Sequence, residues 1–181
     1  VSGEQDSYVD ALENTQDNSN ATPSSHESSS DAFDFNAYVT ILDKNRFADL
    51  KSALIAADYY AVDTETTSLN YMEAELVGIS FAVKPNEAYY IPLMHDYPGA
   101  PEQLDRDWVL SELKPLLEAN DNKKIGQHIK YDKNIFANYK LELNGIRWDT
   151  MLASYVLNSV ATRHDMNSLA LKYLGHKCIS F

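Results

Sequence analysis

The sequence has only one cysteine, Cys178, among 181 residues. A single thiol excludes an internal disulfide framework and fits a reducing compartment. Long hydrophobic runs are also missing, because no uninterrupted apolar stretch approaches the roughly 18 residues that a membrane span requires. The chain shows no basic segment followed by an apolar run, which is the pattern of a secretory signal. We therefore expect a soluble, cytoplasmic protein without a membrane partner, and no pattern indicates an oligomeric state.

Lysine and arginine are absent from residues 1–36, although this segment carries eight acidic residues. The formal net charge of the whole chain is -12, and the rest of the chain holds all 15 bases and the other 19 acids, a balance of -4. A segment rich in Ser, Asn and Asp buries too little apolar surface to offset its ordering entropy. Residues 1–36 are therefore predicted to be an acidic disordered linker, and residues 37–181 a single folded domain.

Positive charge is concentrated between Lys123 and Arg147, where six bases outnumber two acids. An acidic chain argues against nucleic acid as a partner, because such binding usually uses basic surface. The local balance of +4 reverses that argument for this stretch. Charge alone leaves two interpretations open, a solvated helical face and a patch that faces phosphates.

Apolar residues at helical spacing predict a helix over residues 45–57. Three strand-like runs follow, at residues 59–63, 76–83 and 87–93. The last two are separated only by the short break KPNE, so we expect an antiparallel hairpin.

Helical and strand patterns alternate in the rest of the chain. The spacing predicts helices over 104–120, 131–139 and 150–160, with short strands at 123–127 and 145–149. Pro115 is expected to bend or interrupt the first of these helices. Asp149 or Thr150 is placed to cap one helix and Asp165 the next. These elements indicate an α/β fold with a mixed sheet flanked by helices.

Two acids, Asp63 and Glu65, stand one residue apart at the end of the strand-like run YYAVDTET. Residues i and i+2 of a strand face the same way, so these carboxylates project together if the strand reaches Glu65. Paired carboxylates suit Mg²⁺ or Mn²⁺, and the single cysteine and scattered histidines offer no zinc set. The alternative is a solvated strand end in which Thr64 and Thr66 form turn hydrogen bonds.

A third acid, Asp132, lies in the stretch IGQHIKYDKNIF, in the first turn of a predicted helix that follows a strand. Segments distant in sequence converge at strand ends in open α/β sheets. Asp132 is therefore a candidate to join Asp63 and Glu65.

The segments VDTETTSL, GQHIKYDKNIFANY and DTMLASYVLNSVATRHDMNSLALKYLG resemble, in order and spacing, the 3'-5' proofreading exonuclease domain of bacterial family A DNA polymerase I. The resemblance covers residues 37–181 and implies a ribonuclease H-like fold. It also implies a bacterial, cytoplasmic protein whose parent chain holds a 5' nuclease domain, joined through the linker, and a polymerase domain. The chain begins at Val1 without an initiator methionine and ends at LGHKCISF, so we expect it to be part of a longer protein.

The resemblance implies that Asp63, Glu65 and Asp132 are catalytic residues and ligands of two Mg²⁺ or Mn²⁺ ions, which in such sites lie roughly 4 Å apart. The implied reaction hydrolyses the terminal phosphodiester of DNA at a single-stranded or frayed 3' end and releases nucleoside 5'-monophosphates. Residues that the resemblance places at the substrate are Leu69, Gln127, His128, Tyr131, Arg163 and Phe181. The alternatives are packing of Leu69 and Phe181 in the core, packing of Tyr131 in its helix, and pairing of Arg163 with Asp165.

Two departures from the family pattern stand out. His128 occupies a position where the family commonly has Asn, which changes the donor geometry there. The resemblance places the family's third exonuclease motif, Tyr-x-x-x-Asp, beyond Phe181, so we expect an incomplete domain, truncated at its C-terminus. Asp149 and Asp165 lack the spacing of that motif and are interpreted as helix caps. His95, His164 and His176 are interpreted as structural or surface residues.

Two other functions share these features. Some polymerases retain the fold as a catalytically inert scaffold or DNA-binding module, although the three retained carboxylates argue against this for the parent protein. A free-standing exoribonuclease of the ribonuclease D type uses the same carboxylates, but the block YVLNSVATRHDMNSLA favours the polymerase family.

Overall fold

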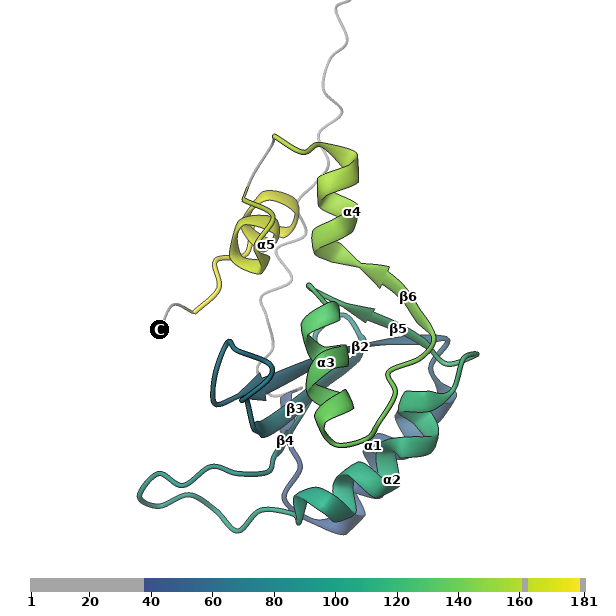
Figure 1. The fold of residues 1–181 in the computed structure, drawn as a ribbon, viewed down its shortest axis with the longest axis vertical. Coiled ribbons are helices and arrows are strands. Elements are labelled where there is room, and N and C mark those ends of the chain that lie inside the picture. The colour runs from purple at the N-terminus through teal and green to yellow at the C-terminus, as the bar shows by residue number, and fades with distance from the viewer. Residues whose placement is uncertain (1–37, 161–162, 180–181) are drawn as a thin grey trace, which may run out of the picture. The chain divides into compact units, whose positions relative to one another are not determined.

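The structure is a computed structural model that describes residues 38–160 and 163–179. It contains one six-stranded sheet with the strand order β1-β4-β3-β2-β5-β6 (Figure 1). The strands are β1 (Tyr38–Thr40), β2 (Tyr59–Thr66), β3 (Leu76–Lys84), β4 (Glu87–Pro92), β5 (Lys123–Gly126) and β6 (Ile146–Asp149). β3 is antiparallel to β2 and β4, whereas the other three pairs are parallel. The predicted mixed sheet and β3–β4 hairpin are confirmed. The predicted linker, residues 1–36, lies outside the described residues.

Each of four helices begins at an aspartate whose carboxylate accepts hydrogen bonds from N–H groups of the first turn. The helices are α1 (Lys44–Ala56), α2 (Arg106–Glu118), α3 (Lys130–Asn138), α4 (Thr150–Leu157) and α5 (Met166–Leu174). The caps are Asp43, Asp105, Asp149 and Asp165, so the predictions for Asp149 and Asp165 are confirmed. In the part of the chain that the structure describes, no helix is long and apolar enough to cross a membrane.

α2 continues through Pro115, so the expected interruption does not occur. A proline inside a helix removes one backbone hydrogen bond and costs about 3 kcal/mol. Leu113 precedes the proline, Leu116 and Leu117 follow it, and all three are buried in the core. Burying leucine side chains on both sides of Pro115 offsets the lost bond, because each contributes about 1.5 to 3 kcal/mol.

One face of the sheet carries the hydrophobic core. Tyr60, Val62 and Thr64 of β2 are buried, and they alternate with more exposed residues. The same hydrophobic cluster includes residues of α1, α2 and α3, among them Phe47, Leu50, Leu113, Leu117, Ile135 and Phe136. These three helices therefore cover that face, and in Figure 1 α3 crosses in front of β2 and β3. Asp63 and Glu65 point to the opposite face, because they alternate with the buried set.

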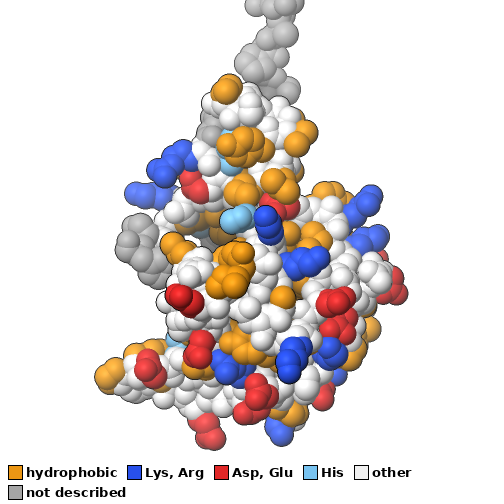
Figure 2. All heavy atoms as spheres, in the orientation of Figure 1, with side chains coloured by type: hydrophobic (Ala, Val, Ile, Leu, Met, Phe, Trp, Pro, Cys, Tyr) orange, Lys and Arg blue, Asp and Glu red, His pale blue; other side chains and the backbone are white. Residues whose placement is uncertain are grey.

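Lys124 of β5 is fully buried on the core side. Its Nζ atom donates hydrogen bonds to Asn122 O at 2.8 Å and to Ala119 O at 3.1 Å, and it lies 5.6 Å from the ring centre of Tyr60. Burial lowers the pKa of Lys124 to about 8. This base of the predicted positive stretch therefore belongs to the core. On the face in Figure 2, Lys and Arg side chains are interspersed with Asp and Glu.

Candidate active site

β2 extends beyond its parallel neighbour β5, and this difference in length creates the site. Pairing of β2 with β5 ends at Ala61, whereas pairing with β3 continues to Thr66. The backbone N–H of Thr64 donates instead to Asp132 Oδ1 at 2.9 Å, and Thr64 Oγ1 donates to the same oxygen at 2.6 Å. The first turn of α3 thus supplies the acceptor that a longer β5 would have supplied.

The three predicted carboxylates all lie at this end of β2, although they are not grouped closely enough to hold a metal ion as they stand. β2 reaches Thr66, so Asp63 and Glu65 lie on one strand and share a face, and Asp132 is bonded to Thr64 between them. Thr64 is buried and bonded to Asp132, whereas Thr66 Oγ1 donates to Ser68 O at 3.1 Å, so only Thr66 makes the turn hydrogen bond of the alternative interpretation. Burial, followed by the charges of Asp132 and Glu65, raises the pKa of Asp63 to about 7. Burial also raises the pKa of Asp132, although the hydrogen bonds from Thr64 oppose the shift.

The donor set fits a hard divalent cation. Among residues 38–160 and 163–179, no salt bridge reaches Asp63, Glu65 or Asp132. Within the same ranges, no three His, Cys, Asp or Glu side chains are already grouped closely enough to hold a metal ion. The available ligands are carboxylate oxygens alone, which Mg²⁺ and Mn²⁺ prefer. A cation drawing these carboxylates together would relieve the repulsion that adds to burial in raising the pKa of Asp63.

The turn between β5 and α3 is tightly constrained. A Cβ atom on Gly126 would lie 2.8 Å from the side chain of Ile129, so a glycine is needed there. His128 has a φ of 58°, in the left-handed region, where Asn and His are enriched among non-glycine residues. This conformation gives a physical reason why His can stand where the family commonly has Asn.

Asp149 holds the same turn from the neighbouring strand. Its Oδ1 accepts from His128 N at 3.1 Å, and its Oδ2 accepts from Ile129 N at 3.0 Å. Oδ1 also accepts from Met151 N and Leu152 N, the cap of α4 that the sequence predicts. The sequence carries no signal for the first two bonds, because they link residues about 20 positions apart and depend on the pairing of β5 with β6.

Two of the predicted substrate residues lie beside the end of β2. The Tyr131 hydroxyl is 2.6 Å from Ser68 O and 2.5 Å from Thr66 Oγ1, so α3 is tied to the connection that follows β2. Leu69, next in that connection, leaves 94% of its surface exposed. Packing in the core is therefore excluded for Leu69, and its contact with substrate stays a prediction.

Gln127 and Arg163 lie in a second group, around α4. Gln127 Nε2 donates to His164 O at 2.8 Å, and Gln127 Oε1 accepts from Thr150 Oγ1. Arg163 Nε is 3.8 Å from Asp165 Oδ2, so the alternative ion pair with Asp165 is present. Phe181 lies outside the described residues.

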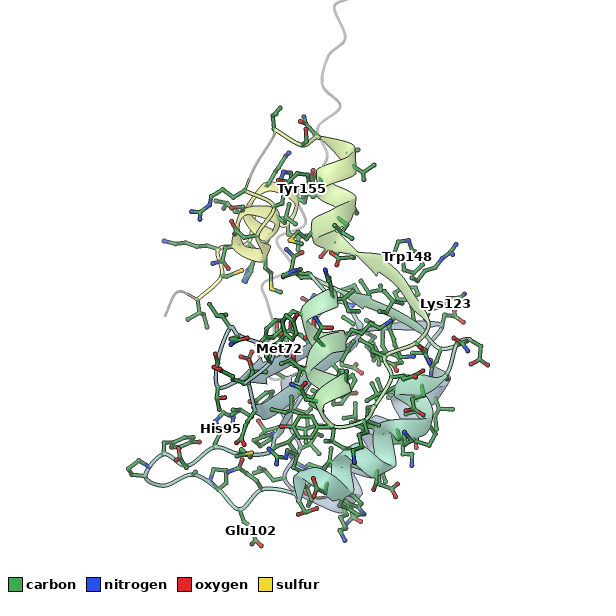
Figure 3. All side chains as sticks on the ribbon, viewed as in Figure 1. Met72, His95, Glu102, Lys123, Trp148 and Tyr155 are labelled. Carbon is green, nitrogen blue, oxygen red and sulfur yellow. The ribbon has the colours of Figure 1, made fainter. Side chains whose placement is uncertain are left out.

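Histidine side chains serve the structure in two places. His164 is buried, its Nδ1 is 2.8 Å from Ser154 Oγ, and its ring packs 4.2 Å from that of Tyr155, which Figure 3 labels on α4. His95, also labelled, follows β4, and its Nε2 is 2.6 Å from the Tyr90 hydroxyl. The structural interpretation of His95 and His164 agrees with these contacts.

Comparisons with known proteins identify a family. A family model described as 3'-5' exonuclease matches residues 38–181. DNA polymerase I of Pseudomonas aeruginosa is 56% identical over 146 residues, a match that covers 80% of this chain and 16% of the polymerase. DNA polymerase I of Rhizobium leguminosarum is 39% identical over 166 residues, covering 82% of this chain and 16% of the polymerase. The chain thus spans about 16% of the length of these relatives.

Solved structures with the same fold are more distant in sequence. NrnC of Brucella melitensis has a TM-score of 0.59 at 19% identity, covering 80% of this chain and 62% of NrnC. RNase D of Escherichia coli has a TM-score of 0.59 at 18% identity, covering 78% of this chain and 34% of RNase D. The predicted ribonuclease H-like α/β fold is thereby confirmed.

Proposed function

Since this chain belongs to the 3'-5' exonuclease family, in the form found in DNA polymerases I, we propose that it hydrolyses the terminal phosphodiester of DNA. Nucleotides leave one at a time from a single-stranded or frayed 3' end as nucleoside 5'-monophosphates. The position of the three carboxylates at the end of β2 supports this proposal most directly, because the charges of Asp132 and Glu65 add to burial in raising the pKa of Asp63 and no salt bridge among the described residues reaches any of the three. Such a cluster is unfavourable alone and becomes favourable around divalent cations.

Asp63, Glu65 and Asp132 would hold two Mg²⁺ or Mn²⁺ ions. Bound there, such ions lower the pKa of a water molecule and stabilise the departing 3' oxygen. The chain's own contribution is placement: β2 presents Asp63 and Glu65 on one face, and Thr64 holds one oxygen of Asp132. The second oxygen of Asp132 is left for the cation.

The substrate residues are assigned by their positions. Leu69 is exposed beside the carboxylates and suits contact with the terminal base, since apolar contact with a base face does not depend on sequence. Tyr131 fixes the connection that carries Leu69. Gln127, His128, Arg163 and Phe181 are proposed to contact sugar or phosphate.

We place the domain within a longer bacterial DNA polymerase I that acts in the cytoplasm. In that chain a polymerase domain and a 5' nuclease domain are the partners of the exonuclease. Residues 1–36 would serve as the linker and residues 37–181 as the exonuclease part. The match to curated polymerases over 80% of this chain supports this arrangement.

Digestion of a 5'-labelled single-stranded DNA oligonucleotide with Mn²⁺ tests the function. We expect a ladder of one-nucleotide steps that disappears with Asp63→Ala. An RNA oligonucleotide of the same sequence is the control for substrate class, and preferential cleavage of RNA would favour the ribonuclease D type. A chain extended through a Tyr-x-x-x-Asp segment addresses the inert alternative. Its failure to cleave either substrate would show an inert scaffold.

A further inference from the structure

α3 carries Asp132 but has no side-chain cap of its own. Its N-cap residue is Ile129, which has no polar side chain, and Asp132 is the third residue of the helix. In a capping box an acid at this third position turns back and accepts the backbone N–H of the N-cap residue. Asp132 points elsewhere, because its Oδ1 accepts the backbone N–H and the hydroxyl of Thr64.

Asp149 supplies the acceptor for the N-cap N–H of α3 that Asp132 does not supply. Its Oδ2 accepts the Ile129 N–H at 3.0 Å, and its Oδ1 accepts the preceding N–H, from His128, at 3.1 Å. β6 pairs Asp149 with Gly126, so the carboxylate is delivered to the end of β5 by the sheet. A negative charge at the start of α3 is also favoured by the helix dipole.

Asp149 differs in this respect from the other helix caps. Among the described residues, the carboxylates of Asp43, Asp105 and Asp165 accept backbone N–H bonds only from residues two or three positions ahead, within their own helices. Asp149 makes two such bonds to α4 and two more to the turn before α3. The four aspartates therefore provide a test with matched controls.

We propose that Asp149 is a positioning residue for Asp132, because it satisfies the start of α3 and so leaves the Asp132 carboxylate directed at Thr64 and the cation site. The inference rests on the proposed function, since it takes Asp132 as a metal ligand. Loss of the Asp149 bonds would let Asp132 turn back to the Ile129 N–H and leave the cation site.

Mn²⁺ binding to the 181-residue chain, followed by the paramagnetic resonance of the free ion, tests the inference without relying on activity. Asp149→Asn keeps one acceptor oxygen for α4 and replaces the other with a donor, which cannot accept the Ile129 N–H. We expect the Mn²⁺ dissociation constant to rise by about 10- to 100-fold, the range for residues that orient metal ligands. Asp165→Asn, a cap without bonds to α3, should leave it unchanged.

The Asp132→Asn background separates positioning from general stability. If Asp149 acts through Asp132, then the double variant Asp149→Asn, Asp132→Asn should bind Mn²⁺ as weakly as Asp132→Asn alone. Equal Mn²⁺ binding by Asp149→Asn and the unchanged protein would overturn the inference while leaving the metal site intact, and so would an equal loss with Asp165→Asn. Unchanged binding by Asp63→Ala and Asp132→Asn would instead overturn the metal site itself and this inference with it.

Discussion

Thr64 lies between Asp63 and Glu65 on β2 and is bonded to the third carboxylate, Asp132. Thr64→Val removes the hydroxyl that lies 2.6 Å from Asp132 Oδ1 and preserves the shape of the side chain. A hydrogen bond to a charged group contributes about 1.5 to 3 kcal/mol, so we expect a loss of that size in the free energy of unfolding by urea. The pKa of Asp132 should rise further. Thr40→Val on β1, an exposed site, is the control, and an equal loss there would contradict the assigned role.

Asp63 makes the stability of the metal-free protein depend on pH. The pKa of Asp63 is raised to about 7, so between pH 3.8 and 7 the folded state binds more protons than the unfolded state. Asp63 therefore contributes its full share of the free energy of unfolding below pH 3.8, and this contribution is lost as the pH rises through 7. Asp63→Asn removes the effect.

We expect Asp63→Asn to be more stable than the unchanged protein by up to about 4 kcal/mol at about pH 8 in EDTA, and by little at about pH 4. Urea unfolding at the two pH values measures the difference. Saturating Mn²⁺ should reverse the order at about pH 8, because only the unchanged protein keeps the full carboxylate set. A difference that does not vary with pH would show that the pKa of Asp63 is not raised.

The sequence is sufficient to predict the pairing of Asp63 with Glu65, because strand periodicity alone puts residues two apart on one face. It is not sufficient to predict the bond between Thr64 and Asp132. That bond exists because β5 stops opposite Ala61 while β2 continues, and strand length is set by the packing of the whole sheet. The second task of Asp149 has the same origin, since it requires β6 to lie beside β5.

Lys124 stabilises the connection between the elements α2 and β5. Lys124→Met removes the donor for Ala119 O and Asn122 O and leaves both carbonyls without it, which we expect to cost about 1 to 3 kcal/mol of unfolding free energy near pH 7. The pKa of Lys124 is lowered to about 8 from 10.5, so the unfolded state binds more protons between these values. Stability relative to Lys124→Met should therefore rise with pH in that window.

Urea unfolding between about pH 7.5 and 10.5 measures this prediction. Lys123→Met is the matched control, because Lys123 precedes Lys124 on β5 and is exposed. A parallel pH dependence in the two variants would contradict the burial of the Lys124 ammonium group.

Helix boundaries were predictable where a local signal exists. Asp149 and Asp165 begin helices as capping chemistry predicts, since a cap uses residues two or three positions apart. Of the bend or interruption expected at Pro115, the interruption does not occur, because the local preference competes with burial of Leu113, Leu116 and Leu117. Tertiary packing decided that competition.

Charge is distributed unevenly along the whole chain. Residues 1–36 carry eight acids and no bases, and without them the formal net charge changes from -12 to -4. A negative tail repels a DNA strand at low ionic strength, and this repulsion is screened by salt over roughly 10 Å at 0.1 M. We expect deletion of residues 1–36 to tighten binding of single-stranded DNA by about two- to fivefold in low salt and to have little effect above about 0.2 M. Fluorescence anisotropy with a labelled oligonucleotide measures the difference.

A chain of unchanged length with these eight acids replaced by Asn and Gln is the control, and it should match the deletion because charge, rather than length, causes the effect. Tighter binding by the deletion alone would assign the effect to steric exclusion by the segment, and unchanged unfolding temperature in both variants would support residues 37–181 as the folding unit.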